Sequence, residues 1–131
     1  MPLTTKRWDD PVDPGDGLRI LVSRYRPRGL RRSDETWDEW IPQLGPSPAL
    51  HARFYGKAGI AIGWSTYQRE YLREMRGQQA IITDLAARVA RGERITLLCS
   101  TACVHESRCH RSLLRDLILA DARANQQTIP T

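Results

Sequence analysis

Residues 95–111 read Ile-Thr-Leu-Leu-Cys-Ser-Thr-Ala-Cys-Val-His-Glu-Ser-Arg-Cys-His-Arg. The run from Ile95 to Ser100 predicts a buried β-strand because it is short, apolar and followed by polar residues. A polar loop with every cysteine of the chain comes next, and an amphipathic helix begins near Cys109. Open α/β sheets bind ligands where a strand leads into a helix, because the free N–H groups of the helix favour an anion. We therefore expect the functional site in this segment.

The sequence on both sides of this segment has the spacing of amphipathic helices. Before it, a helix that ends at Gly92, a suitable C′ residue, is predicted from the apolar stripe Ile81, Ile82, Leu85, Ala86 and Val89. After it, the last helix is predicted from Leu113, Leu114, Leu117, Ile118 and Ala120. An earlier helix, opened by a capping box of Ser65 and Gln68, is predicted from Trp64, Tyr67, Tyr71, Leu72 and Met75.

The first half of the chain supplies the other strands. Leu18 to Tyr25 is a clear strand, and Leu3 to Trp8 is a weaker edge strand. The turn-rich residues 9–17 join them, either as a plain connection or as an acidic loop around a cation. We predict an α/β fold with a small sheet, at least partly parallel, flanked by helices. It forms a single domain of residues 1–131, with an edge strand and loop in 1–17 and a frayed tail in 125–131.

The middle of the chain predicts two short helices. One begins at Ser33 or Asp34 and runs through Trp40, with Trp37 and Trp40 on one side that either packs into the core or forms a stacking platform; we favour the core. The other has Ser47 as N-cap and Pro48 as first residue and ends at Gly56. We interpret His51 as a surface residue. Residues 56–63 are expected to form a flexible connection, and the sequence does not indicate whether it moves over the site as a lid.

Composition points to a cytoplasmic protein with an affinity for anions. The 131 residues carry a net charge of +5, supplied by arginine because Lys6 and Lys57 are the only lysines. This bias favours an anionic partner, although a G+C-rich genome gives the same bias. The crowding of three cysteines into one loop argues against a secreted disulfide scaffold. No apolar leader or membrane-length run occurs, so we expect no membrane association. The sequence has no signal for an oligomeric state.

Five arginines lie within the nine residues from Arg24 to Arg32, together with Pro27 and Gly29. This segment predicts either a solvated basic loop or an anion-binding loop at the end of the first clear strand. We predict that the strands Leu18 to Tyr25 and Ile95 to Ser100 lie in one sheet with both carboxyl ends facing the same way. If they are neighbours, the Arg loop (residues 24–32) lies beside Arg111 and the helix that starts near Cys109.

The chain resembles the domain of unknown function 488 family, in particular its YeaO-like branch. The motifs that match are Asp16-Gly17, Arg24-Tyr-Arg-Pro-Arg-Gly29, Asp38-Glu-Trp-Ile-Pro-Gln-Leu-Gly-Pro-Ser47, Leu50, Phe54, Trp64, Tyr67, Tyr71 and Thr96-Leu-Leu-Cys99. The triplet Cys109-His-Arg111 is similar to other branches, and the loop before it is longer than usual. The resemblance implies a compact α/β fold with a pocket shared by the Arg-Pro loop and the Cys-His-Arg turn. It implies no established activity.

Three interpretations remain open for the cysteine loop. The first is an anion site for a phosphate or nucleotide, in which Arg24, Arg26, Arg28, Cys109, His110 and Arg111 bind the ligand. In a catalytic version of this site, a cysteine with a lowered pKa acts as nucleophile, and the candidate catalytic residues are Cys99, Cys109 and His110. The second is a zinc site built from Cys103, His105, Cys109 and His110, with Cys99 as a further candidate. The third is a purely structural loop. We favour no cofactor.

Two functions of different classes follow. One is a small enzyme that acts on a phosphorylated or nucleotide-like substrate, and the other is a binding module for nucleic acid or a protein partner. A small anionic ligand in an enclosed pocket fits slightly better, because the sequence has no basic strip interleaved with aromatic residues. We expect burial of the core residues Ile20, Val22, Leu85, Leu97, Leu114, Leu117 and Ile118.

Overall fold

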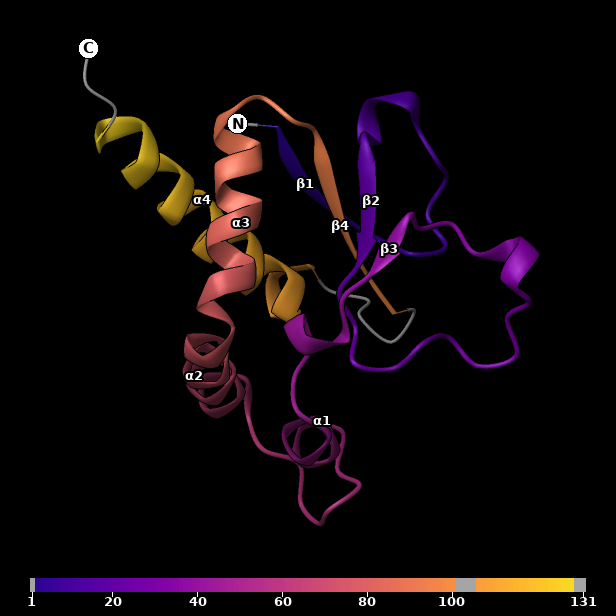
Figure 1. The fold of residues 1–131 in the computed structure, drawn as a ribbon. Helices are drawn as coiled ribbons and strands as arrows, with labels where there is room; N and C mark the ends of the chain where they lie inside the picture. The colour runs from indigo at the N-terminus through magenta and orange to yellow at the C-terminus, as the bar shows by residue number, and fades with distance from the viewer. Residues whose placement is uncertain (1, 101–105, 129–131) are drawn as a thin grey trace.

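The computed structural model describes residues 2–100 and 106–128 and shows a four-stranded sheet with helices (Figure 1). The strands are β1 (Leu3–Arg7), β2 (Leu18–Leu21), β3 (Glu39–Trp40) and β4 (Ile95–Cys99). The helices are α1 (Pro48–Phe54), α2 (Trp64–Met75), α3 (Gln79–Ala90) and α4 (His110–Thr128). The strand order is β1-β4-β2-β3, and all neighbouring strands are parallel. The predicted α/β fold class is confirmed.

Strand β4 lies inside the sheet, between β1 and β2. All five of its residues are buried, as expected for a strand whose residues are mostly apolar on both faces. Leu97 pairs with Thr5 of β1 on one side and with Ile20 of β2 on the other. The carboxyl ends of β2 and β4 therefore lie at the same edge, as predicted. Strand β2 ends at Leu21, earlier than expected.

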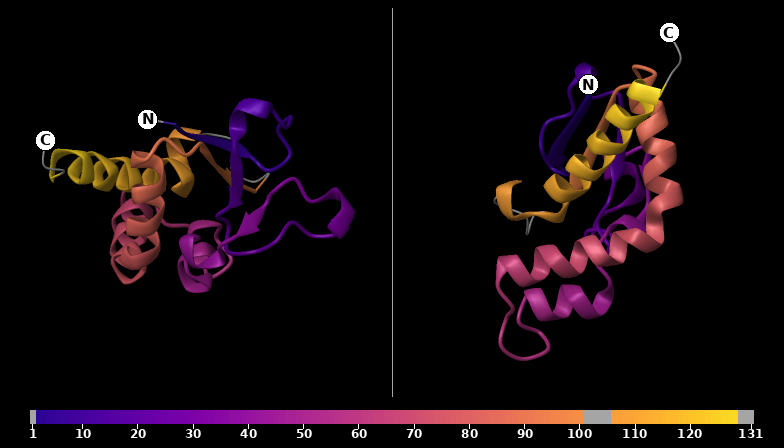
Figure 2. Two further views of the ribbon diagram at one scale, coloured as in Figure 1. Left: turned by 45° about the horizontal axis from the view of Figure 1, so that its top comes forward. Right: turned by 90° about the vertical axis from the view of Figure 1, so that its left-hand side faces the viewer.

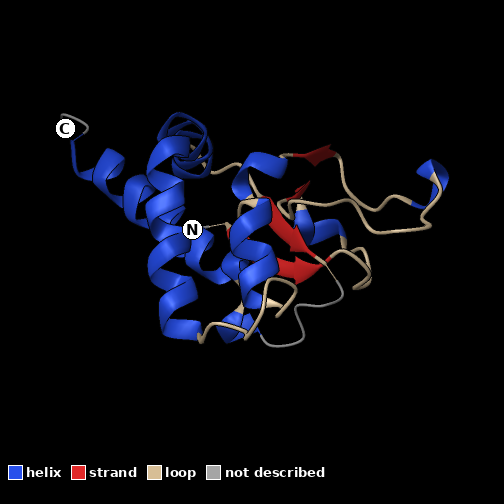
Figure 3. Ribbon diagram, turned by 90° about the horizontal axis from the view of Figure 1, so that it is seen from below, coloured by secondary structure: helices blue, strands red, loops and turns tan. Residues whose placement is uncertain are grey.

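Helices cover one face of the sheet. Helices α3 and α4 lie side by side against it, and α2 joins α3 through a bend and packs on α1 (Figure 2). Six of the seven predicted core residues are at most 1 % exposed, and Leu117 is half-buried, which confirms the periodicity. Viewed from below, most of the helical structure lies on one side of the strands, and a long loop extends on the other (Figure 3).

The other face of the sheet is covered by loops and contains a buried ion-pair cluster. The carboxylate of Asp16 pairs with Lys6, whose Nζ lies 2.7 Å away, and with the guanidinium of Arg19. Asp16 and Arg19 are 5 % and 4 % exposed. The hydroxyl of Thr96 in β4 donates to the carbonyl of Asp16 at 2.8 Å. Asp16 is thus neutralised by side chains of the chain itself, which supports the interpretation of residues 9–17 as a connection.

The helix predicted from Ser33 or Asp34 to Trp40 is wrong. A 3-10 turn covers Arg32–Asp34, and the end of the segment is strand β3. The backbone N–H of Asp38 donates to Arg19 O at 2.8 Å, and its carboxylate accepts from Arg19 N at 2.9 Å. Pairing with β2 satisfies backbone groups on both strands, so this tertiary contact outweighs the local capping signal.

The predicted pairing of Trp37 and Trp40 on one core face is also wrong. The Trp37 ring packs edge-on against Trp8, with 6.3 Å between ring centroids. Trp40 is 40 % exposed, and its indole N–H donates to the carbonyl of Ser23 at 2.8 Å. The helical spacing of the two tryptophans has no structural meaning here, because the segment is extended.

Two helix termini follow the sequence signals and a third does not. Ser47 caps α1 by accepting from Leu50 N at 3.2 Å, and Gly92 lies at the C′ position of α3 with φ 92°, both as predicted. Helix α2 begins at Trp64 with Gly63 as N-cap, so the capping box of Ser65 and Gln68 does not form. Ser65 lies inside the first turn instead.

The tail expected to fray from Asn125 is helical to Thr128. Asp121 of α4 accepts hydrogen bonds from Gln79 and Thr83 of α3 at 3.0 and 3.1 Å, and Ala122 is buried. These contacts anchor the later turns of α4, so the helix extends beyond its apolar stripe. Among the described residues, no helix has the length and apolar character to cross a membrane.

Candidate functional site

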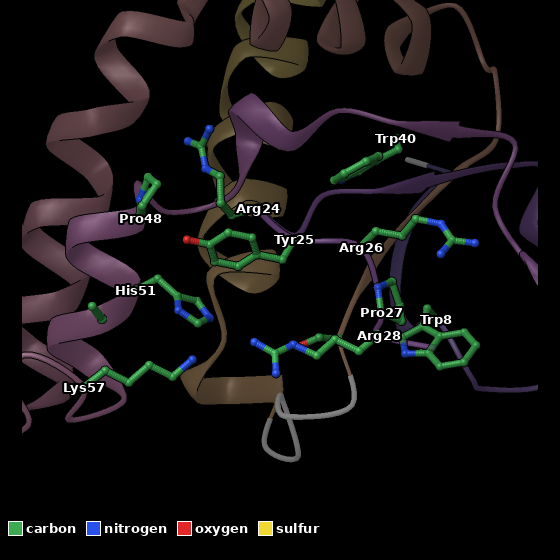
Figure 4. Close-up of a pocket in the computed structure, with 12 residues that line it drawn as sticks. Trp8, Arg24, Tyr25, Arg26, Pro27, Arg28, Trp40, Pro48, His51 and Lys57 are labelled. Atoms are coloured by element: carbon green, nitrogen blue, oxygen red, sulfur yellow. The ribbon is translucent and has the colours of Figure 1, made fainter. Parts of the chain in front are cut away.

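A pocket of about 880 Å³ opens where the segments after β2 and β4 meet α1 (Figure 4). The loop after β2 contributes residues 24–28, and Ser100 follows β4. The other wall comes from α1 and the connection after it, with His51 and Lys57. Because β2 and β4 are parallel neighbours, their carboxyl ends deliver both loops to one edge of the sheet. The parallel strand pair therefore positions this site.

Arg24, Arg26 and Arg28 all line the pocket, but they have different roles. Arg24 donates through Nε to Pro46 O at 2.9 Å and through Nη2 to Gly45 O at 3.3 Å. These bonds fix the Arg24 guanidinium to the turn before α1. Arg24 therefore joins two walls of the pocket.

Arg26 is directed away from the pocket centre (Figure 4). Its Nε lies 3.5 Å from the carboxylate of Glu35, and its guanidinium carbon lies 5.8 Å from the centroid of the Trp37 ring. This ion pair and cation–π contact neutralise and orient the side chain. Arg26 thus holds the long loop after β2 in place.

Arg28 and Lys57 are the two cations whose tips point toward one another across the pocket (Figure 4). Both are exposed, and neither has an ion-pair partner within the described part of the chain. The described lining contains four Arg or Lys side chains and no carboxylate. Two like charges brought together without a counter-charge repel each other, so this arrangement is stabilised by an anion.

His51 is half-buried in the pocket wall, which corrects its interpretation as a surface residue. Its ring lies edge-on to Tyr25, with centroids 5.2 Å apart, and 4.6 Å from the Tyr55 ring. Burial, and to a smaller extent the charge of Lys57, lower the pKa of His51 below its ordinary value of 6.5. The imidazole is therefore neutral at pH 7 and available to accept or donate a hydrogen bond.

A smaller cavity of about 50 Å³ adjoins the pocket and shares Arg24, Tyr25, His51 and Ser100 with it. His110, the first residue of α4, lies in its wall. The Nε2 atom of His110 is 2.9 Å from the carbonyl oxygen of Val22, and burial lowers the pKa of His110 to about 4. His110 is thus a neutral, fixed group at the deep end of the site.

Cys99 does not have the lowered pKa expected of a catalytic thiol. Its side chain is fully buried, and burial raises the pKa of Cys99 to about 12, against the opposing charges of Arg111 and Arg7. Its sulfur lies 3.5 Å from that of Cys109. Removal of solvent destabilises the thiolate more than the nearby arginines stabilise it. Cys99 is therefore a protonated thiol in the packed interior, and its proposed role as nucleophile is not supported.

Cys109 and Arg111 are 1 % and 5 % exposed, and neither lines the two cavities. Two nitrogens of Arg111, Nε and Nη1, are buried without a hydrogen-bond partner within the described residues. The structure thus places the Arg24–Arg28 loop and His110 around two adjoining cavities. That Arg111 contacts an anion bound there stays a prediction.

Only two of the four predicted zinc ligands, Cys109 and His110, lie within the described residues. Cys103 and His105 lie outside the described residues. Cys109 Sγ and His110 Nδ1 are 4.0 Å apart. Among the described residues, no group of three or more His, Cys, Asp or Glu side chains is arranged to hold a metal ion.

The sequence did not predict that several other residues line the pocket. Trp8, Tyr25, Trp40 and His51 come from four separate segments, and their convergence depends on the tertiary fold. Lys57 had a weak signal, because it is one of two lysines and lies in the connection 56–63.

Comparison with known proteins gives consistent family matches. The model of the "Active DUF488-N3 subclade" matches residues 3–122. The uncharacterized protein YeaO of Escherichia coli K12 is 35 % identical over 100 residues, which are 76 % of this chain and 84 % of that protein. The uncharacterized protein Rv3073c of Mycobacterium tuberculosis H37Rv is 26 % identical over 107 residues, which are 82 % and 85 % of the two chains. No solved structure matches the chain.

Proposed function

This chain belongs to the domain of unknown function 488 family, and we propose that it binds a small anionic molecule of the phosphate or nucleotide class. The proposed site is the pocket between the Arg24–Arg28 loop, α1 and Lys57. The observation that carries the proposal is the pair Arg28 and Lys57, whose charges converge in a lining where the described residues include no carboxylate.

The two cations suit phosphate in complementary ways. The planar guanidinium of Arg28 can donate two parallel hydrogen bonds to phosphate oxygens, whereas the ammonium of Lys57 acts as a compact charge. The neutral His51 imidazole lies beside the same region and adds a hydrogen-bonding group, whereas the Tyr25 hydroxyl is directed toward α1 (Figure 4). A phosphate held between the walls would lower the repulsion between the two cations.

A nucleotide fits the pocket better than inorganic phosphate alone. The volume of about 880 Å³ is within the usual range of small-molecule sites. Tyr25 and Trp40 are 51 % and 40 % exposed, and both line it. The hydrogen bond from Trp40 to Ser23 fixes the indole, so its exposed surface is preorganised for stacking against a planar base.

Reaction chemistry at this site, if the ligand is a substrate, is assigned to His51 and not to a cysteine. The buried Cys99 is protonated and does not line the pocket. Burial and Lys57 lower the pKa of His51, so its imidazole is in the neutral form that a general base requires, and it lies beside the converging cations.

Calorimetric titration with inorganic phosphate and with a nucleoside monophosphate tests this proposal. Arg28→Ala and Lys57→Ala should each weaken nucleotide binding about tenfold, because each removes a charge-assisted contact. Arg32→Ala is the matched control, since Arg32 is an exposed arginine of the same segment that does not line the pocket. No binding by wild type, or equal affinities for all four proteins, would refute the anion pocket.

A further inference from the structure

Helix α2 carries a second group of cations, on a surface that the pocket does not use. Arg69 and Arg73 lie in α2, and Arg76 is its C-cap residue. Spacings of four and three residues place all three on one side. All three are exposed, and with Ser65, Gln68 and Leu72 they line a shallow hollow of about 300 Å³. We call these six residues the α2 arginine face.

The carboxylates of α2 are directed to another side of the helix. Glu70 pairs with Arg53 of α1, and Glu74 accepts from the backbone N–H of Ser47 at 2.8 Å and from its hydroxyl. These are the only acidic residues of α2. Each is therefore used to hold α1 against α2, and neither neutralises the arginine face.

The arginine face consequently has an unbalanced positive charge. Within the described part of the chain, Arg69, Arg73 and Arg76 have no ion-pair partner. Like charges at a spacing of four residues destabilise a helix. The cost is removed when an external polyanion neutralises the face.

We propose that the α2 arginine face binds the sugar-phosphate backbone of nucleic acid without sequence preference. Because a helix rises 1.5 Å per residue, the seven steps from Arg69 to Arg76 span about 10 Å. One strand of a duplex presents a phosphate about every 3.4 Å along its axis, so roughly three phosphates lie within that span. Three arginines match this spacing, and Ser65 and Gln68 supply neutral donors beside them.

A membrane or an acidic protein fits this face less well. Leu72 is its only apolar side chain and is half-buried. A helix that lies in a membrane interface presents a broad apolar stripe, and a protein interface has an apolar or aromatic centre. A polar, strongly basic and shallow surface is instead typical of backbone contacts with nucleic acid.

The test is a titration of a short labelled DNA duplex by fluorescence anisotropy between about 50 and 200 mM salt. The triple variant Arg69→Gln, Arg73→Gln, Arg76→Gln should bind at least about tenfold more weakly than wild type at the lower salt concentration. It should also lose roughly two to three units of the slope of log affinity against log salt, about one for each phosphate contact.

The matched control is the triple variant Arg31→Gln, Arg91→Gln, Arg123→Gln. These arginines are exposed and scattered, and their replacement removes the same net charge. The affinity of the control variant for the duplex should stay within about threefold of wild type, because scattered charges contribute little once salt screens them. Circular dichroism melting of both triples reports whether the fold is retained.

Three results would overturn the proposal. If both triples weaken binding equally, or if wild type does not bind the duplex, the face is not a nucleic-acid site. If wild type binds vesicles that contain phosphatidylserine and the α2 triple loses only that binding, the partner is a membrane surface. The result is independent of the pocket, because none of the six residues lines it.

Discussion

The Nε2 atom of His110 lies 2.9 Å from the carbonyl oxygen of Val22, so the first residue of α4 is tied to the segment that follows β2. This bond connects the loop after β2, which carries the arginines, to the helix that follows the cysteine segment. The ring of His110 is also 5.5 Å from that of Tyr71 in α2. One buried imidazole therefore joins three elements around the deep end of the site.

The first prediction concerns acid stability. The pKa of His110 is about 4 in the fold and about 6.5 when unfolded, so between these pH values only the unfolded chain binds the proton. Stability from His110 is thus complete above pH 6.5 and is lost as the pH falls toward 4. The loss is roughly 2–3 kcal/mol between pH 7 and 4.5.

Urea unfolding of wild type and His110→Gln at both pH values isolates this effect. Glutamine does not titrate, so the variant should lose less stability on acidification than wild type, whatever its stability at pH 7. The same pH dependence in both proteins would show that His110 is not held neutral.

The second prediction concerns the buried ion pairs of Asp16. Asp16→Asn should destabilise the protein by about 3 kcal/mol, because it leaves the buried Arg19 without its counter-charge. Asp9→Asn is the control, since Asp9 pairs with Arg7 at 3.0 Å on the surface, and should cost less than about 1 kcal/mol. Denaturant unfolding at neutral pH measures the free energy of unfolding of both variants. Equal destabilisation by the two substitutions would contradict the burial of the Asp16–Arg19 ion pair.

The third prediction concerns thiol reactivity. With a pKa of about 12, Cys99 is ionised in only about one molecule in 100,000 at pH 7, and it is fully buried. Iodoacetamide should therefore leave Cys99 unmodified in the native protein and label it after unfolding, as read by peptide mass spectrometry. Rapid native labelling of Cys99 would restore the interpretation as an activated nucleophile.

The fourth prediction uses two glycines with opposite surroundings. A Cβ at Gly45 would lie 2.3 Å from the backbone nitrogen of Arg24, so Gly45→Ala should destabilise the protein by about 1–3 kcal/mol and displace the pocket wall. Gly77, between α2 and α3, has nothing within 4 Å of an added Cβ. Gly77→Ala should therefore stabilise the protein by about 0.5–1 kcal/mol. Thermal melts of the two variants should shift in opposite directions.

Regular periodicity let the sequence determine the layout of the fold. Helix α3 with its end at Gly92, the apolar stripe of α4 and the buried strand β4 each repeat one local pattern over several residues. The Ser47 cap is equally local, because its donor is three residues away. These signals predicted the core residues and the two strands whose loops lie at one edge of the sheet. The Arg24–Arg28 loop was predicted from its charge alone.

Only the tertiary structure decided which side chains form the site. Trp40 became part of a strand because β2 offered backbone partners, and His51 entered the pocket because α1 packs beside the Arg loop. The roles of Arg24, Arg26 and Arg28 differ because Gly45, Pro46 and Glu35 engage the first two. The pKa of Cys99 likewise depends on how much water the fold removes. Long-range packing sets partners, burial and charge balance, and a local sequence pattern does not encode them.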